Sequence, residues 1–205
     1  MEMQGILQNN INVSGKFVAV EIRALVCDAP ARAFVCGTPS HVSSHGCGKC
    51  TQIGRKLNNV LVYSSEPGEL LTDDDFLRRK YAGHHNKKFR NTMTPLENIG
   101  VKMITQIALD SMHLLDLGVM RKFLLRLLQD KVNVKVEKIK KKNMSEILKS
   151  LSPFITKEFV RKPRSMDEIL NWKATEFRQV LLYTGILIFK DNVRDVGYFF
   201  APNLT

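Results

Sequence analysis

The chain has 205 residues, 44% of them hydrophobic, which is enough for one substantial domain or a domain with a smaller companion. No run approaches about 18 apolar residues, so we expect no membrane span, and the start MEMQGILQNN lacks the basic and apolar regions of a secretory signal. The formal net charge is +11, and a basic surface favours polyanions such as nucleic acid.

The first segments predict a strand that runs into a helix. Residues 1–16 are polar and predict a frayed lead-in. The nearly continuous apolar run Phe17–Val26 is typical of a strand that is covered on both faces. Pro30 suits the first turn of a following helix. Asp28 therefore lies where a strand ends, the usual place for ligands in open α/β sheets, although Asp is also a favoured helix N-cap.

The cysteines are expected to be reduced thiols or metal ligands rather than disulfides, because the start shows no secretory signal. They are Cys27, Cys36, Cys47 and Cys50. Cys47 and Cys50 form a C-x-x-C after a loop rich in Gly, Ser and His, which includes His41 and His45. Two such thiolates supply half of a tetrahedral metal site. A redox pair and a metal-free structural loop are the alternatives.

Shorter elements fill the middle of the chain. Leu57–Tyr63 predicts a strand. Thr72 predicts the cap of a helix whose first turn holds Asp73–Asp75. Adjacent helical residues point about 100° apart, so these three acids do not converge on one ion. The segment His84–Lys88 is basic and could supply a zinc ligand, contact phosphate or be solvated. Thr94–Glu97 begins another short helical or turn segment.

The strongest helix is predicted over Asp110–Leu128. Apolar residues recur at helical spacing and place His113 on an apolar face, with Asp110 one turn before it. The apolar positions of this stripe are Leu117, Met120, Leu124 and Leu127. Such an Asp–His pair could orient an imidazole for metal or proton chemistry. A hydrogen-bonded core histidine beside an N-cap aspartate is the alternative.

The last third combines a basic run with a carboxylate in an apolar stripe. Residues 131–142 could form an exposed strand, a linker or a phosphate-contacting arm, and the segment KIKKK within them is compatible with a nuclear signal. Ser165–Glu168 resembles a capping box and predicts one helix to about Thr184. On that helix Glu176 lies between Trp172 and Val180, where it needs a partner, a proton or a metal. No cation shares its face, which favours a functional role.

Four blocks, in this order, resemble DNA transposases of the CACTA (En/Spm-like) group and the transposase-derived proteins of animal genomes. They are Cys27–Arg32 (CDAPAR), His41 with Cys47-x-x-Cys50, Leu109–Leu114 (LDSMHL) and Trp172–Arg178 (WKATEFR). The resemblance covers roughly residues 17–190. It implies a ribonuclease H-like core with three metal-binding acids, the DDE/D arrangement, and two Mg²⁺ ions for phosphoryl transfer.

The resemblance also implies roles for single residues. Asp28 matches the second acid, Glu176 matches the third, and Asp110 with His113 matches a D-x-x-H motif. The C-x-x-C matches a zinc-site motif of the related Transib-like recombinases. Further zinc ligands would come from His113 or from His84 and His85. DNA as partner and a nuclear location follow from the family, and a homo-oligomer is compatible with it.

The expected fold class is α/β: a partial ribonuclease H-like core, made of a strand and helix with a C-terminal helix, interrupted by a mostly α-helical insertion. The expected divisions are a disordered or frayed lead-in (1–16), the partial core with the C-x-x-C loop (17–56), a mainly helical insertion (57–164), the C-terminal core helix (165–190) and an irregular tail (191–205).

One departure from the family pattern affects activity. The first acid should lie on an earlier strand, but Glu2 is the only acid before Phe17. We therefore expect a transposase-derived chain that is not competent for strand transfer alone. The alternatives are a zinc-stabilised DNA- or protein-binding module without catalysis, and a redox or hydrolytic enzyme that uses Cys47, Cys50 and His113.

Overall fold

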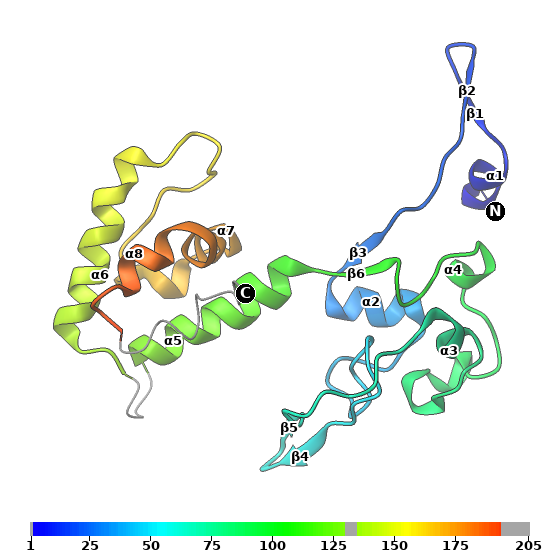
Figure 1. The fold of residues 1–205 in the computed structure, drawn as a ribbon, viewed down its shortest axis with the longest axis horizontal. Helices are drawn as coiled ribbons and strands as arrows, with labels where there is room; N and C mark the ends of the chain where they lie inside the picture. Colours follow the sequence, from blue (N-terminus) through cyan, green and yellow to red (C-terminus); the bar gives the residue numbers. More distant parts are fainter. Residues whose placement is uncertain (1, 130–134, 194–205) are drawn as a thin grey trace, which may run out of the picture. The chain divides into compact units, whose positions relative to one another are not determined.

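The computed structural model describes residues 2–129 and 135–193, and the chain divides into two compact units (Figure 1). Unit 1 is Met1–Asp110 and unit 2 is Ser111–Thr205. The chain mixes helices with small sheets, as the α/β expectation requires. The division falls directly after a strand, inside the stretch expected to be a helical insertion.

Unit 1 contains short strands and short helices. Its strands are β1 (Ile11–Val13), β2 (Lys16–Val18), β3 (Leu25–Cys27), β4 (Arg55–Leu57), β5 (Val60–Val62) and β6 (Ile107–Leu109). Its helices are α1 (Glu2–Gln8), α2 (Ala29–Cys36), α3 (Asp73–Leu77) and α4 (Pro95–Asn98), with 3₁₀ turns η1 (Ala82–His84) and η2 (Lys87–Phe89). Its core consists of Cys36, Leu71, Phe76, Val101, Met103, Ile104 and Ile107.

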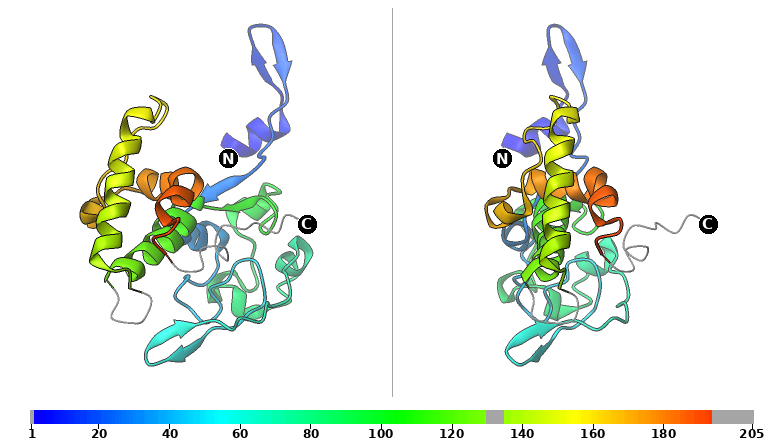
Figure 2. Two further views of the ribbon diagram at one scale, coloured as in Figure 1. Left: turned by 60° about the vertical axis from the view of Figure 1, so that its left-hand side comes forward. Right: turned by 90° about the vertical axis from the view of Figure 1, so that its left-hand side faces the viewer.

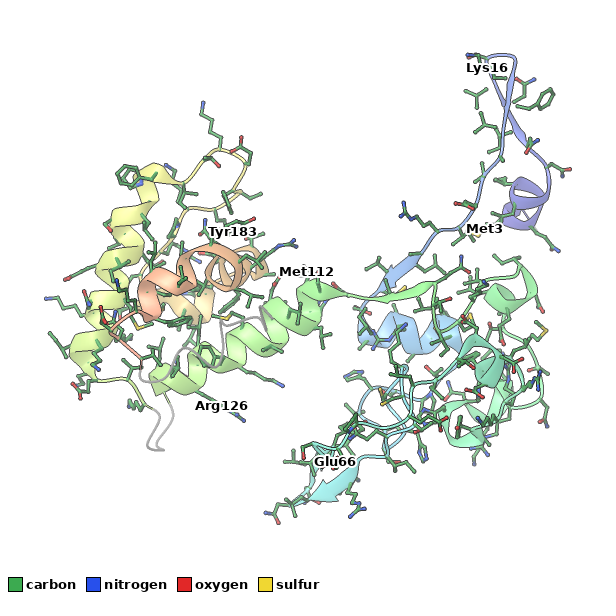
Figure 3. The ribbon with its side chains drawn as sticks, in the orientation of Figure 1. Met3, Lys16, Glu66, Met112, Arg126 and Tyr183 are labelled. Carbon is green, nitrogen blue, oxygen red and sulfur yellow. The ribbon has the colours of Figure 1, made fainter. Side chains whose placement is uncertain are left out.

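β1 and β2 form an exposed antiparallel hairpin. Ser14 and Gly15 both have positive φ, 52° and 83°, which suits a tight hairpin turn. Lys16 lies beside this turn (Figure 3). Phe17, expected in a buried strand, is 73% exposed. The single buried strand Phe17–Val26 is wrong, because residues 16–18 fold back on residues 11–13 as an exposed hairpin and residues 19–24 lie outside any strand. The stretch expected as a lead-in contains α1 and β1.

β4 and β5 form a second hairpin where one strand was predicted. Asn58 and Asn59 at its turn have φ values of 48° and 62°. Asn tolerates this left-handed region better than most residues, and two such residues in succession favour a hairpin turn. The Asn-Asn pair was the sequence feature that should have divided the predicted strand.

α3 confirms the predicted cap and separates the three aspartates. The Thr72 hydroxyl accepts a bond from the Asp75 backbone N–H at 3.0 Å. The three carboxylates have different partners, which are Thr105 and the Ile104 backbone for Asp73, Arg78 for Asp74 and Lys80 for Asp75. They therefore act as caps and ion pairs, as predicted, and do not converge on one ion.

A buried ion pair between Arg79 and Glu97 joins α3 to α4. Arg79 Nη1 donates to Oε1 of Glu97 at 2.7 Å, and Nη2 donates to Oε2 at 2.9 Å. The side chains are 13% and 3% exposed. Glu97 also accepts the backbone N–H of Thr94 at 2.7 Å. Removing one partner of such a pair would leave an uncompensated buried charge.

Unit 2 is helical in its described residues. Its α-helices are α5 (Arg121–Gln129), α6 (Lys138–Leu151), α7 (Ala174–Gln179) and α8 (Gly185–Phe189). Its π-helices are η3 (Met112–Met120) and η6 (Val180–Thr184), and its 3₁₀ helices are η4 (Ser152–Phe154) and η5 (Met166–Asn171). α6 lies beside α8 (Figures 1 and 2). Apolar residues from these helices form one core, which includes Leu124, Met144, Phe177, Ile188 and Phe189.

The long helix predicted from Ser165 to Thr184 is wrong in its continuity. Ser165 caps a 3₁₀ helix by accepting from the Asp167 backbone N–H at 3.2 Å. Lys173 is extended, with φ −97° and ψ 167°, so α7 begins afresh after it. The basic segment 138–142 opens α6, whereas residues 131–134 and the tail from 194 lie outside the described residues.

Gly37→Ala is expected to destabilise unit 1. Gly37 has φ 62°, and a Cβ there would lie 2.5 Å from Cδ2 of Phe89. A non-glycine residue in this region costs about 1–3 kcal/mol, and Phe89 would also have to move. Urea unfolding measures the loss. The control is Gly48→Ala, whose new Cβ would meet nothing nearer than Arg32 Nε at 4.0 Å; equal effects from the two changes would contradict the prediction.

Candidate functional site

Two parallel strands of unit 1 end side by side, and each is followed at once by an aspartate. β3 pairs with β6 so that Cys27 lies opposite Leu109 in the last registered pair (Figure 1). Neighbouring strands lie about 4.8 Å apart, so Asp28 and Asp110, one residue further on, leave the sheet at the same edge. We call these two residues the carboxylate edge. It is the position where open α/β sheets usually bind ligands.

Asp28 also caps α2. Its Oδ1 accepts the backbone N–H of Ala31 at 2.8 Å, and Pro30 lies in the first turn. The capping role considered from the sequence is therefore confirmed. A carboxylate has two oxygens, so a cap through Oδ1 is compatible with a second bond at Oδ2. Capping and cation contact are not exclusive at this residue.

η3 turns His113 away from the apolar face on which it was predicted. In a π-helix the hydrogen bonds run from i to i+5, so each turn takes more residues than an α-helical turn. Asp116 is consequently buried, at 4% exposed, whereas His113 is exposed. The predicted face holds from Met120 onward, where the helix becomes α5. Asp116 was missed because an α-helical period was assumed throughout.

Glu176 is buried, at 2% exposed, with a local partner that the sequence did not reveal. Arg164 donates to both of its oxygens, from Nε at 2.6 Å and from Nη2 at 2.9 Å. The backbone N–H of Lys173 donates to Oε2 at 2.8 Å. The hydrogen bonds and charge of Glu176 raise the pKa of Arg164. The prediction that Glu176 has no cation beside it, which had favoured a functional role, is therefore wrong.

The four predicted acid–base residues fall in both units. Asp28 and Asp110 belong to unit 1, whereas His113 and Glu176 belong to unit 2. The structure brings Asp28 and Asp110 to one sheet edge. The assembly of Asp28 with Glu176 at one metal centre stays a prediction.

The C-x-x-C loop brings its two thiols together. The Sγ atoms of Cys47 and Cys50 lie 3.2 Å apart. Two thiolates on one tetrahedral zinc would lie about 3.8 Å apart, given Zn–S bonds of about 2.3 Å, so a small adjustment would suffice. Burial raises the pKa of Cys50, and the neighbouring Cys47 raises it further.

Two histidines lie close to this loop: His84 contacts the backbone of Cys47, and His45 packs against His84. His84 Nδ1 lies 3.1 Å from the carbonyl oxygen of Cys47. The ring centroids of His45 and His84 are 5.3 Å apart. Burial lowers the pKa of His84, which keeps its imidazole neutral near pH 7. A neutral ring whose Nδ1 is fixed by a carbonyl is the form in which histidine ligates metals through Nε2.

Neither expected metal has a complete ligand set in the part of the chain that the structure describes. No group of three or more His, Cys, Asp or Glu residues there could hold an ion. For zinc, the thiol pair fits half of a tetrahedral site. For Mg²⁺, the carboxylate edge supplies two carboxylates, which is fewer than a two-metal centre uses.

No protein-family model, curated protein or solved structure matches the chain. Within residues 2–129 and 135–193, no helix has the length and apolar character needed to cross a bilayer.

Arg164→Met is expected to destabilise unit 2, because it leaves the Glu176 carboxylate buried without its cation. We expect a loss of about 1–3 kcal/mol in the free energy of unfolding, less than for a fully buried pair because Arg164 is 30% exposed. Chemical denaturation measures it. The control is Arg178→Met on the exposed side of α7, and an effect as large there would contradict the assignment.

Proposed function

We propose that this chain derives from a DDE/D DNA transposase of the CACTA group and acts as a DNA-binding protein rather than a strand-transfer enzyme. The observation that carries the ancestry is the carboxylate edge, where two parallel registered strands are each followed by an aspartate. The family's ribonuclease H-like core places metal-binding acids at strand ends in this way. By the resemblance, Asp28 corresponds to the second of these acids, and Asp110 of the D-x-x-H motif lies at the same sheet edge.

Binding without cleavage follows from the ligands at that edge. When bound, a Mg²⁺ pair would stabilise both the attacking and the leaving oxygen of the transferred phosphoryl group. Asp28 and Asp110 alone are too few to hold two ions, and Glu176 is engaged by Arg164. The net charge of +11 supports contact with a polyanion. A nuclear location belongs to the same proposal.

A binding and nicking assay tests this function. We expect the protein to bind duplex DNA by fluorescence anisotropy and to leave supercoiled plasmid intact in Mg²⁺ or Mn²⁺. Absence of DNA binding would contradict the proposal. So would metal-dependent nicking that disappears in Asp28→Asn, a change that removes the charge but keeps a good helix cap. Asp74→Asn is the control, since this exposed acid pairs with Arg78 and lies outside the carboxylate edge.

A zinc-stabilised binding module is the second candidate, and the 3.2 Å approach of the two Sγ atoms favours it. His84, which contacts the backbone of Cys47, and His45, which packs against His84, are the candidates for the remaining positions. A bound zinc would cross-link the loop to η1 and thereby stabilise unit 1. In this reading the metal is structural and takes no part in catalysis.

Cobalt substitution tests the zinc module. We expect Co²⁺ to give the absorption of a tetrahedral thiolate site, and chelation to lower the melting temperature. Cys47→Ser should abolish the absorption, whereas Cys27→Ser, a thiol outside the loop, should not. Metal release can be followed at the same time with a chromogenic chelator. A spectrum that both variants retain would contradict the module.

A further inference from the structure

The loop Asn86–Arg90, which we call the basic loop, carries three exposed cations on a fixed backbone. They are Lys87, Lys88 and Arg90. The chain has no Asp or Glu between Glu97 and Asp75, so no acid of the loop itself neutralises them. The basic loop is therefore a concentrated positive patch within unit 1.

Ion pairing separates these cations from the basic residues just before them. Arg78, Arg79 and Lys80 pair with Asp74, Glu97 and Asp75 respectively. In the part of the chain that the structure describes, the cations of the basic loop form no ion pair with an acid. Their charge is thus available to an external anion, whereas that of the preceding residues is compensated internally.

Hydrogen bonds hold the backbone of the loop in place. The N–H of Asn86 donates to the carbonyl of Gly37 at 2.9 Å. Arg79 Nε donates to the carbonyl of Phe89 at 2.9 Å, and the Thr92 hydroxyl donates to that of Lys88 at 2.9 Å. A backbone that is already ordered loses little conformational entropy when its side chains bind a ligand.

Packing fixes the loop on its inner side. The ring of Phe89 lies over Gly37, where it fills the space that a Cβ would occupy. Phe89 therefore packs against the protein and the three cations are exposed, with the Lys88 ammonium 5.4 Å from the centroid of the Phe89 ring. An outer surface of cations flanked by Asn86 and Asn91, without a large apolar side chain of its own, suits a phosphate backbone better than an apolar partner.

We propose that the basic loop is the phosphate-contacting element of unit 1, with nucleic-acid backbone as its ligand. The inference rests on the proposed DNA-binding function and assigns it to Lys87, Lys88 and Arg90. These side chains contact phosphates and carry no base specificity of their own. Their backbone is held by the hydrogen bonds of Asn86, Phe89 and Lys88, and none of the three pairs with an acid among the described residues.

The test compares two sets of substitutions in the full chain. The loop variant is Lys87→Gln, Lys88→Gln and Arg90→Gln together. The control is Arg55→Gln with Lys56→Gln, which removes exposed cations from the β4–β5 hairpin. Binding of a 30-base-pair duplex, an arbitrary length of about three helical turns, is measured by anisotropy over a range of salt concentrations. All changes are at exposed positions, and circular dichroism checks that the fold is kept.

We expect the loop variant to bind at least about tenfold more weakly and to lower the salt slope by about 2–3, since each phosphate contact contributes about 0.9. The control variant should change the affinity and the salt slope by less than half as much as the loop variant does. Equal losses of affinity in the two variants, or no loss in the loop variant, would overturn the inference. DNA binding by the unaltered chain would still support the proposed function in that case.

Poly-glutamate distinguishes nucleic acid from an acidic protein partner. It carries comparable negative charge without phosphates, so the loop variant should lose less affinity for it than for the duplex. An equal loss for both polyanions would overturn the assignment to nucleic acid. Failure of the unaltered chain to bind duplex would instead overturn the proposed function, and the inference with it.

Discussion

The Arg79–Glu97 ion pair is the constraint on which the order of unit 1 depends. One guanidinium donates to both oxygens of Glu97 and also to the backbone carbonyls of Phe76, Phe89 and Thr92. Burial would raise the pKa of Glu97, but the bonds from Arg79 and Thr94 hold it below its ordinary value. This buried charge pair adds a further link between segments of unit 1 to the parallel pairing of β3 with β6. Arg79 has φ 57°, a strained value that such a network can maintain.

The same network connects the surfaces that carry the proposals. Arg79 fixes Phe89 in the basic loop, while Asn86 bonds to Gly37 at the end of α2. Asp28 caps the other end of α2, so the carboxylate edge and the basic loop share one helix as their support. On the other side, His84 bonds to Cys47 and brings the thiol pair into the same assembly. Residues far apart in sequence are held here by hydrogen bonds to backbone carbonyls, since unit 1 has only a small apolar core.

Helix caps could be predicted from the sequence, whereas contacts between segments far apart in the chain could not. The caps at Asp28 and Thr72 were predicted because capping depends on residues three positions apart. The parallel pairing of β3 with β6 joins segments about eighty residues apart in the numbering, and three-residue strands leave almost no periodic pattern. Arg164 escaped notice because its bond to Glu176 crosses an irregular connection rather than a helical turn. Phe17 was misplaced because an apolar run does not reveal whether anything covers it.

η3 and α5 form one continuous helix from Met112 to Gln129, but its two parts have different numbers of residues per turn. Downstream of Met120, α-helical spacing anchors Leu124 and Leu127 in the core. Upstream, the wider turns set the direction of His113 and Asp116 separately. A deletion of one residue within Met112–Met120 would rewind this stretch to α-helix and rotate His113 by about one residue step, about 100°. Because η3 packs against α7, such a rotation would change that contact, whereas Leu124 and Leu127 would keep their places in the core.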